Sequence, residues 1–177
     1  MRRCPNLIFQ ILTKRPEFIS DRLPPDWDEG YPNVWLGVSV ENPQFLRRMH
    51  ILRQIPSQVR FVSAEPLLAR LGHLDLFGFH WVIVGGESGP GFRPMDHAWA
   101  REIRDQCQRE HVAFFFKQSA AIRTEMGTEL DGREWKEYPL LTSPESRVPS
   151  PDKRRRRDER HPRRIRPAYR QDAPVRQ

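Results

Sequence analysis

Five short runs of β-branched and aromatic residues recur along the chain, and each run stops abruptly at polar residues. They occupy residues 6–12, 34–40, 59–64, 81–84 and 112–116. The run Trp-Val-Ile-Val at 81–84 shows no alternation of apolar and polar residues, which is typical of strands covered on both faces. Helical patterns separate several of these runs. Strands that alternate with helices predict a parallel sheet or barrel rather than a sandwich.

Capping signals predict a helix after three of the five strands. A proline fits the first turn of a short helix over residues 16–23. Asn42 and Pro43 are typical of the N-cap and first position of a second helix, whose outer face would carry Arg48. An N-cap aspartate predicts a third helix over residues 96–110. These helices supply the crossovers that parallel strands require.

The chain has 177 residues and is short for a complete eight-stranded α/β barrel. We therefore expect residues 1–142 to form a partial, TIM-like (βα) barrel of about five parallel strands. A hairpin or loop over residues 128–139, with a turn at Asp131 and Gly132, would cover one end of it.

Polar residues begin at the carboxyl end of every predicted strand. Right-handed crossovers would bring these ends to one rim, where they look like an assembled pocket for a substrate or cofactor. The candidate residues are Lys14, Ser39, Glu41, Asn42, Ser63, Glu65, Gly85, Gly86, Glu87, Ser88, Lys117 and Gln118. The glutamates would bind polar ligand groups, and the lysines would bind a carboxylate or phosphate. The alternative is that strand ends are simply where polar residues begin.

The glycine-rich segment 85–91 is not a standard phosphate loop. Two of its glycines have the Walker A spacing, but Phe92 and Arg93 follow where a lysine and a serine or threonine are needed. Glu87 and Ser88 could therefore face a ligand, or they could only satisfy backbone donors.

Cysteine content limits the redox and metal chemistry of the chain. Its two cysteines, Cys4 and Cys107, are far apart in sequence, which argues against a disulfide scaffold and predicts a reducing, cytoplasmic environment. Cys107 would lie on the core face of the third helix as a packed thiol. The histidines show no paired metal-ligand spacing, so no metal site is predicted. No apolar run is long enough to span a bilayer, and no membrane partner is expected.

The net charge of +7 belongs to the C-terminal segment. Residues 143–177 carry 12 Lys/Arg and 5 Asp/Glu, whereas residues 1–142 carry 18 of each kind. This basic, proline-rich segment is predicted to be a disordered tail. An alternative, non-enzymatic function is sequence-independent binding of nucleic acid. The residues that would contact phosphates are Lys153, Arg154, Arg155, Arg156 and Arg157.

Taken in order, five motifs resemble those of the phage gene-product-37/gene-product-68 family, an uncharacterised radical-SAM-like family classed as a domain of unknown function. The motifs are Leu12–Pro16, Trp35–Asn42, Ser63–Leu68, Val84–Gly89 and Phe115–Gln118. The resemblance extends over about residues 4–139. It implies the C-terminal part of a (βα) barrel with its pocket at the carboxyl ends of the strands.

The resemblance further implies S-adenosylmethionine and a [4Fe-4S] cluster in the complete family domain. Three cysteines of an N-terminal portion would hold that cluster, and this chain lacks such a triad. We therefore expect no cofactor on this chain alone, and no radical catalysis unless a partner supplies the missing N-terminal barrel half. The remaining alternative is an inactive remnant of a truncated prophage gene.

Overall fold

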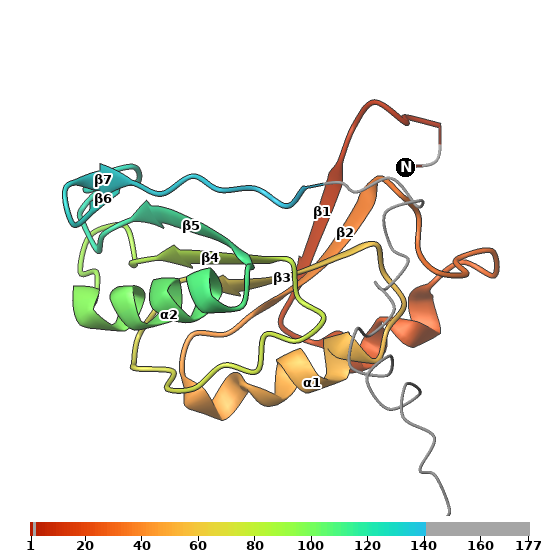
Figure 1. Cartoon of the computed structure of the whole chain (residues 1–177), viewed down its shortest axis with the longest axis horizontal. Coiled ribbons are helices and arrows are strands. Elements are labelled where there is room, and N and C mark those ends of the chain that lie inside the picture. The colour runs from red at the N-terminus through yellow and green to blue at the C-terminus, as the bar shows by residue number, and fades with distance from the viewer. Residues whose placement is uncertain (2, 141–177) are drawn as a thin grey trace, which may run out of the picture. The chain divides into compact units, whose positions relative to one another are not determined.

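The computed structural model describes residues 1 and 3–140, and its centre is a five-stranded sheet (Figure 1). The strands lie side by side in chain order and all neighbours are parallel. They are β1 (Phe9–Thr13), β2 (Val34–Ser39), β3 (Val59–Ala64), β4 (Trp81–Gly85) and β5 (Ala113–Gln118). The predicted α/β class is confirmed. A TIM-like barrel is not confirmed, because no pairing joins β1 to β5 within the described residues and the sheet stays open.

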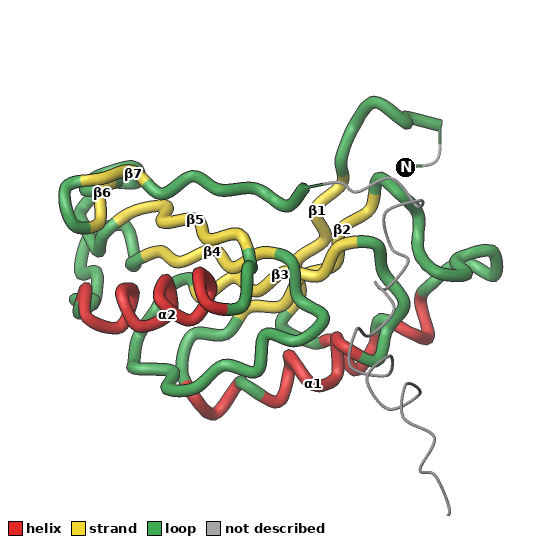
Figure 2. Tube along the Cα trace, viewed as in Figure 1, coloured by secondary structure: helices red, strands yellow, loops and turns green. Residues whose placement is uncertain are grey.

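Two α-helices lie on the same face of this sheet, α1 (Arg47–Arg53) and α2 (His97–Arg109) (Figure 2). The predicted caps are confirmed. The Asn42 side chain accepts a hydrogen bond from the backbone of Gln44 at 3.1 Å, and that of Asp96 accepts one from Ala98 at 2.8 Å. Three 3-10 helices complete the set, η1 (Pro16–Phe18), η2 (Ser20–Arg22) and η3 (Pro43–Phe45). The single helix predicted over residues 16–23 is therefore two 3-10 turns, held by bonds between residues three apart.

Alternate residues of the strands pack against the helices and form the main core. Val34 and Leu36 of β2 meet Leu52 of α1 and Ile103 of α2 in one cluster of buried side chains. Cys107 belongs to the same cluster, which confirms the packed thiol. Burial, assisted by the charge of Glu137, raises the pKa of Cys107 to about 12, so its thiol stays protonated at neutral pH.

The opposite, open face of the sheet carries a small aromatic cluster, and no helix of residues 3–140 covers it. Trp35, Phe61 and Trp81 are buried there, and the rings of Phe61 and Trp81 lie 5.8 Å apart. Phe61 depends on Gly37 of the neighbouring strand, because a Cβ atom on Gly37 would come within 2.3 Å of the phenyl ring. Gly37 thus allows the ring to lie across β2 and complete an aromatic floor.

A C-terminal strap, residues 135–140, closes the outer edge of β5 and folds onto the open face. The backbone of Trp135 accepts a hydrogen bond from Phe116 at 2.8 Å, and Glu137 donates one to Phe114 at 3.1 Å. The ring of Tyr138 then lies 5.5 Å from that of Trp81. The strap therefore protects one sheet edge and forms a wall beside the aromatic floor.

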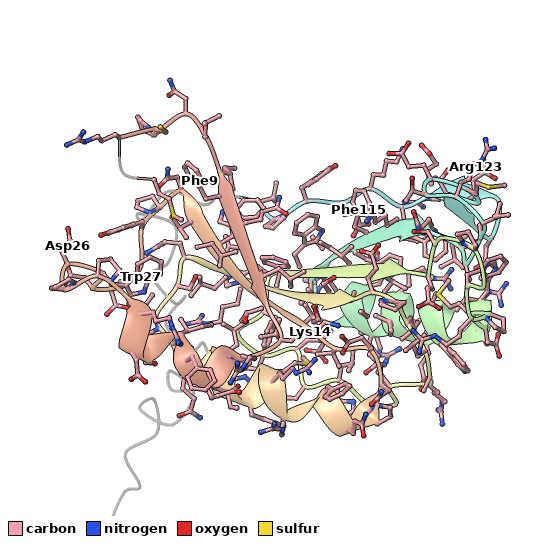
Figure 3. All side chains as sticks on the ribbon, turned by 180° about the vertical axis from the view of Figure 1, so that it is seen from behind. Phe9, Lys14, Asp26, Trp27, Phe115 and Arg123 are labelled. Atoms are coloured by element: carbon pink, nitrogen blue, oxygen red, sulfur yellow. The ribbon has the colours of Figure 1, made fainter. Side chains whose placement is uncertain are left out.

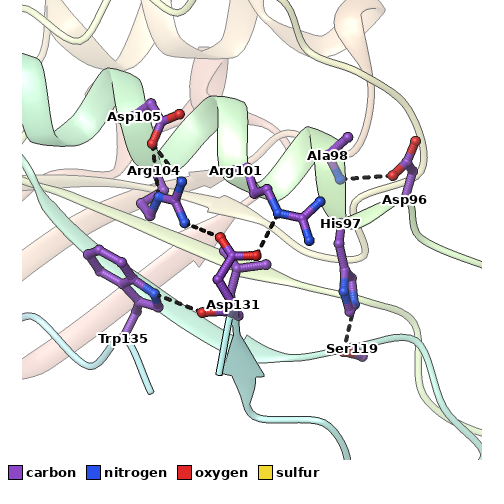
Figure 4. A network of polar contacts seen from close by, with 10 residues as sticks. Asp96, His97, Ala98, Arg101, Arg104, Asp105, Ser119, Asp131 and Trp135 are labelled. Carbon is purple, nitrogen blue, oxygen red and sulfur yellow. Dashed lines mark hydrogen bonds and ion pairs between the residues drawn. The ribbon is translucent and has the colours of Figure 1, made fainter. Parts of the chain in front are cut away.

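The predicted hairpin precedes the strap and consists of β6 (Glu129–Leu130) and β7 (Arg133–Glu134). Its turn residues Asp131 and Gly132 have φ angles of +58° and +70°, as a type I′ turn requires. The Asp131 carboxylate accepts hydrogen bonds from Arg101 at 2.7 Å and Arg104 at 2.6 Å (Figure 4). These guanidinium groups lower the pKa of Asp131 and fasten the hairpin to α2.

Two sequence predictions concern the tail and the membrane. Residues 143–177, with Lys153 to Arg157, lie outside the described residues, so their disorder and their binding of nucleic acid stay predictions. No helix in the described part of the chain is long and apolar enough to cross a membrane.

Substitution of Gly37 tests the aromatic floor. We expect Gly37→Ala to lower the free energy of unfolding by about 1–3 kcal/mol, the usual cost of overpacking, because the Phe61 ring must move. In a Phe61→Ala background the same change should cost much less, since the ring is gone. Urea unfolding followed by circular dichroism measures both. An equal cost in the two backgrounds would show that Gly37 does not act through Phe61.

Candidate functional site

Polar side chains replace apolar ones on the open face as the strands approach their carboxyl ends. Ser39, Ser63 and Ile83 form a row across β2, β3 and β4. Side chains two residues further along a strand point to the same face, which places Glu65 beyond Ser63 and Lys117 beyond the Phe115 position of β5. The open face is therefore aromatic toward the start of the strands and charged toward their ends.

A cleft of about 750 Å³ lies on this open face, the side seen in Figure 3, where Phe115 is labelled. Its volume is in the range of small-molecule pockets. The cleft combines the aromatic floor, two strand ends, and residues from the strap and the loop before it. The lining residues are Gln10, Leu12, Phe61, Ser63, Glu65, Trp81, Ile83, Phe115, Lys117, Glu125, Thr128, Lys136 and Tyr138.

An ion pair stands at the polar end of the cleft. Lys117 Nζ donates to Glu65 Oε1 at 2.7 Å, and the two side chains are 44% and 24% exposed. Gly85 leaves room for this pair, because a Cβ atom there would lie 3.2 Å from the Glu65 carboxyl carbon. The structure therefore brings together Ser63, Glu65, Gly85 and Lys117 among the predicted site residues. Both charges remain accessible to a ligand.

Lys14, Ser39 and Glu41 belong to a separate clamp around the buried Glu41 carboxylate. The Glu41 carboxylate pairs with Lys14 and also accepts a hydrogen bond from Arg48 at 2.9 Å. Arg48 donates a second bond to the Ser39 carbonyl oxygen at 2.7 Å. Burial alone would raise the pKa of Glu41, but the Lys14 hydrogen bond and the charges of Lys14 and Arg48 lower it overall. The clamp ties β1, β2 and α1 together, and its residues do not line the cleft.

The prediction that Arg48 faces outward is wrong. Its residue exposure is 8%, and its guanidinium group lies 3.9 Å from the centre of the Phe45 ring. The helical pattern gave no sign of this inward turn, because the partner Glu41 comes from the preceding strand end. A buried carboxylate with two cationic neighbours is satisfied structurally, so Glu41 is a less available ligand-binding group than Glu65.

Glu87 and Ser88 form a loop beside the site rather than a wall of the cleft. The Glu87 carboxylate accepts hydrogen bonds from the Arg93 guanidinium at 2.5 and 2.8 Å and from the Arg93 backbone at 2.8 Å. These bonds lower the pKa of Glu87 to about 2. Ser88 forms an isolated parallel β-bridge with Ala121. Glu87 therefore stabilises the glycine-containing turn through its bonds to Arg93.

The remaining predicted residues support the backbone around the strand ends. The buried Gln118 side chain donates to the Gly86 carbonyl at 3.2 Å and accepts from the Glu125 backbone at 2.8 Å. Gly86 is needed where it stands, because a Cβ atom would lie 2.2 Å from the Ala120 nitrogen. Asn42 caps η3 through its side chain. These groups hold the loops in place and leave ligand contact to the cleft residues.

Ten of the thirteen residues that line the cleft were not among the predicted site residues, and four of these ten follow β5. Glu125, Thr128, Lys136 and Tyr138 line the cleft from the loop and the strap. The rule that sites gather at strand ends does not predict these residues, because they follow the last strand of the sheet. The turn at Asp131 indicates only that the chain reverses there.

The two cysteines of the sequence do not fit the three-thiolate [4Fe-4S] cluster that the family resemblance implies. Within residues 1 and 3–140, no three His, Cys, Asp or Glu side chains come together as metal ligands. Cys4 is exposed and Cys107 is buried with a raised pKa, so the two cysteines cannot provide the three thiolates that the family resemblance implies.

The Glu41 clamp predicts a large and pH-dependent effect on stability. We expect Glu41→Gln to lower the free energy of unfolding by about 3–5 kcal/mol, because Arg48 would stay buried without its charge partner. Lys14→Met should cost less, since the Lys14 side chain is 60% exposed. Urea unfolding of the three proteins at neutral pH measures these differences.

The pH dependence has a definite sign. Because folding lowers the pKa of Glu41, its contribution is present above the unfolded pKa and is lost as the pH falls through the folded pKa. The gap in stability between the parent and Glu41→Gln should therefore shrink on acidification. A gap that is absent at neutral pH, or that widens in acid, would contradict the clamp.

Comparison with known proteins gives a family and no characterised relative. No curated protein and no solved structure matches the chain. One family described as "Protein of unknown function (DUF5131)" matches residues 1–139, which contain every strand and helix named above. Because the match covers most of the 177 residues, the chain belongs to this family.

Proposed function

We propose that residues 1–140 bind a small organic anion with an aromatic or apolar body in the cleft on the open face of the sheet. The observation that carries this proposal is the Glu65–Lys117 pair, which stands at the polar end of an aromatic floor in a cleft of ligand size. Pockets of this kind combine apolar walls with a few charged groups that orient the ligand.

The aromatic floor and the charged rim of the cleft would contact different parts of such a ligand. Phe61, Trp81 and Phe115 offer ring edges and faces, with Trp81 and Phe115 in a T-shaped contact at 6.0 Å. Lys117 and Lys136 reach the cleft from β5 and the strap, so a carboxylate or phosphate would meet a cation from each wall. Glu65 would accept hydrogen bonds from an amine or hydroxyl on the same ligand.

The resemblance to the phage gene-product-37/gene-product-68 family extends this proposal. On that reading the chain is the substrate-binding part of a radical-SAM-like protein, and the cluster and S-adenosylmethionine chemistry depend on a separate polypeptide with three cysteines. The clustered thiolates that the chemistry needs are not available here, so no radical step is assigned to the residues of this chain.

Binding of 3-phenylpropionate, compared with the uncharged 3-phenylpropan-1-ol, tests the cleft. For Lys117→Met we expect the dissociation constant of the anion to rise at least about tenfold, the equivalent of one charged hydrogen bond, with no change for the alcohol. Arg70→Met is the matched control, because Arg70 pairs with Glu102 outside the cleft lining. Isothermal titration calorimetry measures the dissociation constants of the parent, Lys117→Met and Arg70→Met.

Two results would contradict the proposed site. The first is an unchanged affinity of Lys117→Met for the anion. The second is an equal loss in Arg70→Met, which would indicate a non-specific charge effect. Thermal unfolding of each variant would show whether a change in binding reflects a change in folding.

Anaerobic incubation with iron and sulfide tests whether cluster binding depends on a polypeptide separate from this chain. We expect this chain alone to bind no stoichiometric [4Fe-4S] cluster and to leave S-adenosylmethionine uncleaved, because it lacks three thiolate donors. Co-expression with a three-cysteine polypeptide that complements the open sheet should produce the cluster absorption band. A stoichiometric cluster on the isolated chain would contradict the assignment.

A further inference from the structure

The charges around the cleft on the open face leave a surplus of negative charge. Lys117 already pairs with Glu65 at 2.7 Å. Lys136, the second lysine of the lining, pairs with Glu134 at 2.8 Å. Glu125 also lines the cleft, and among the described residues no hydrogen bond or ion pair reaches its carboxylate. This carboxylate would repel a ligand that carries only negative charge, so the lining favours a ligand with a positive charge as well.

Glu125 is held on the cleft wall by its backbone rather than by its side chain. Its φ of +61° lies in the left-handed region, which residues with a side chain adopt at an energetic cost. The backbone N–H of Glu125 donates to Oε1 of the buried Gln118 at 2.8 Å, and Gln118 in turn donates to the Gly86 carbonyl oxygen at 3.2 Å. The loop is thus fixed at this position, while the residue remains exposed and its carboxylate available to a ligand.

The Glu65–Lys117 pair limits which anions can bind beside it. A ligand carboxylate that took Lys117 as its only partner would leave Glu65 without a cation next to the aromatic floor, which is unfavourable. A ligand ammonium group beside that carboxylate would give Glu65 a new partner, so every charge would remain paired. The exchange itself costs little, because partly exposed ion pairs contribute little to stability.

Two opposite charges this close together match the polar end of an α-amino acid. Its ammonium and carboxylate groups are attached to one carbon atom, and the charged atoms of Glu65 and Lys117 lie 2.7 Å apart. The side chain would then lie on the floor of Phe61, Trp81 and Phe115, whose rings already pack against one another in tilted and T-shaped contacts. A residue at either end of a peptide carries only one of the two charges, so the match is to the free amino acid.

We propose that the cleft binds a free aromatic α-amino acid. Lys117 binds its carboxylate, Glu65 binds its ammonium group, and Glu125 adds a second negative charge that favours the ammonium group. The aromatic floor contacts the ring of the ligand. This inference rests on the proposed binding of an organic anion in the cleft and narrows that proposal to one class of ligand.

Three compounds with the same ring separate the two charges of the ligand. L-Phenylalanine carries both charges, 3-phenylpropionate carries only the carboxylate, and 2-phenylethylamine carries only the ammonium group. For the full 177-residue chain, isothermal titration calorimetry should give L-phenylalanine a dissociation constant at least about tenfold lower than that of either other compound. N-Acetyl-L-phenylalanine and L-phenylalaninamide, which represent the two ends of a peptide, should bind like the singly charged compounds.

Glutamine substitutions remove each carboxylate charge and keep the size of the side chain. Glu65→Gln and Glu125→Gln should each raise the dissociation constant of L-phenylalanine at least about fivefold. The affinity for 3-phenylpropionate should stay the same or increase, because a repelling charge is gone. Glu102→Gln is the matched control, because Glu102 pairs with Arg70 outside the cleft lining. Thermal unfolding checks that each variant is folded.

Two results would overturn this inference and leave the proposed anion site in place. One is binding of 3-phenylpropionate that depends on Lys117 and is as tight as that of L-phenylalanine. The other is an affinity for L-phenylalanine that is unchanged in both cleft variants. Binding of 3-phenylpropionate that does not depend on Lys117 would overturn the proposed site and this inference with it. The comparison of ligands on the parent chain uses no variant, so it decides the inference even where a substitution prevents folding.

Discussion

The alternation of side chains along five parallel strands is the constraint on which the rest of the structure depends. One set of alternate residues, which includes Val34, Leu36 and Val82, lies under the helices and forms the main core. The other set contains Phe61 and Trp81 and forms an aromatic floor that no helix in the described part of the chain covers. Core and cleft are thus opposite faces of the same strands, and a shift of one residue in any strand would exchange them.

The three carboxylates predicted at strand ends are paired in different ways. Glu41 is buried between Lys14 and Arg48 and holds strands and helix together. Glu87 is tied to Arg93 in a surface loop. The Glu65–Lys117 pair alone among these three predicted carboxylate sites lines the cleft, where both partners keep access to solvent. A carboxylate at a strand end can therefore be structural or available, and its neighbours decide which.

Much of this architecture follows from local sequence signals. Strand positions, the caps at Asn42 and Asp96 and the turn at Asp131 rest on residues that are near one another in the chain, and the structure confirms them. Burial of Arg48 could not be predicted, because it depends on a carboxylate from another element. The contribution of the strap to the cleft could not be predicted either, because residues such as Lys136 approach β3 and β4 only after the chain has folded back. Long-range pairing decides the details of the site.

Backbone chemical shifts measured during titration with 3-phenylpropionate would test the central claim most directly, because they map contact residue by residue. The cleft predicts that the largest changes occur at Ser63, Glu65 and Lys117 and in the strap, with small changes along α1 and α2. Changes concentrated on the helix-covered face, or saturable binding without any change near Glu65 and Lys117, would contradict it.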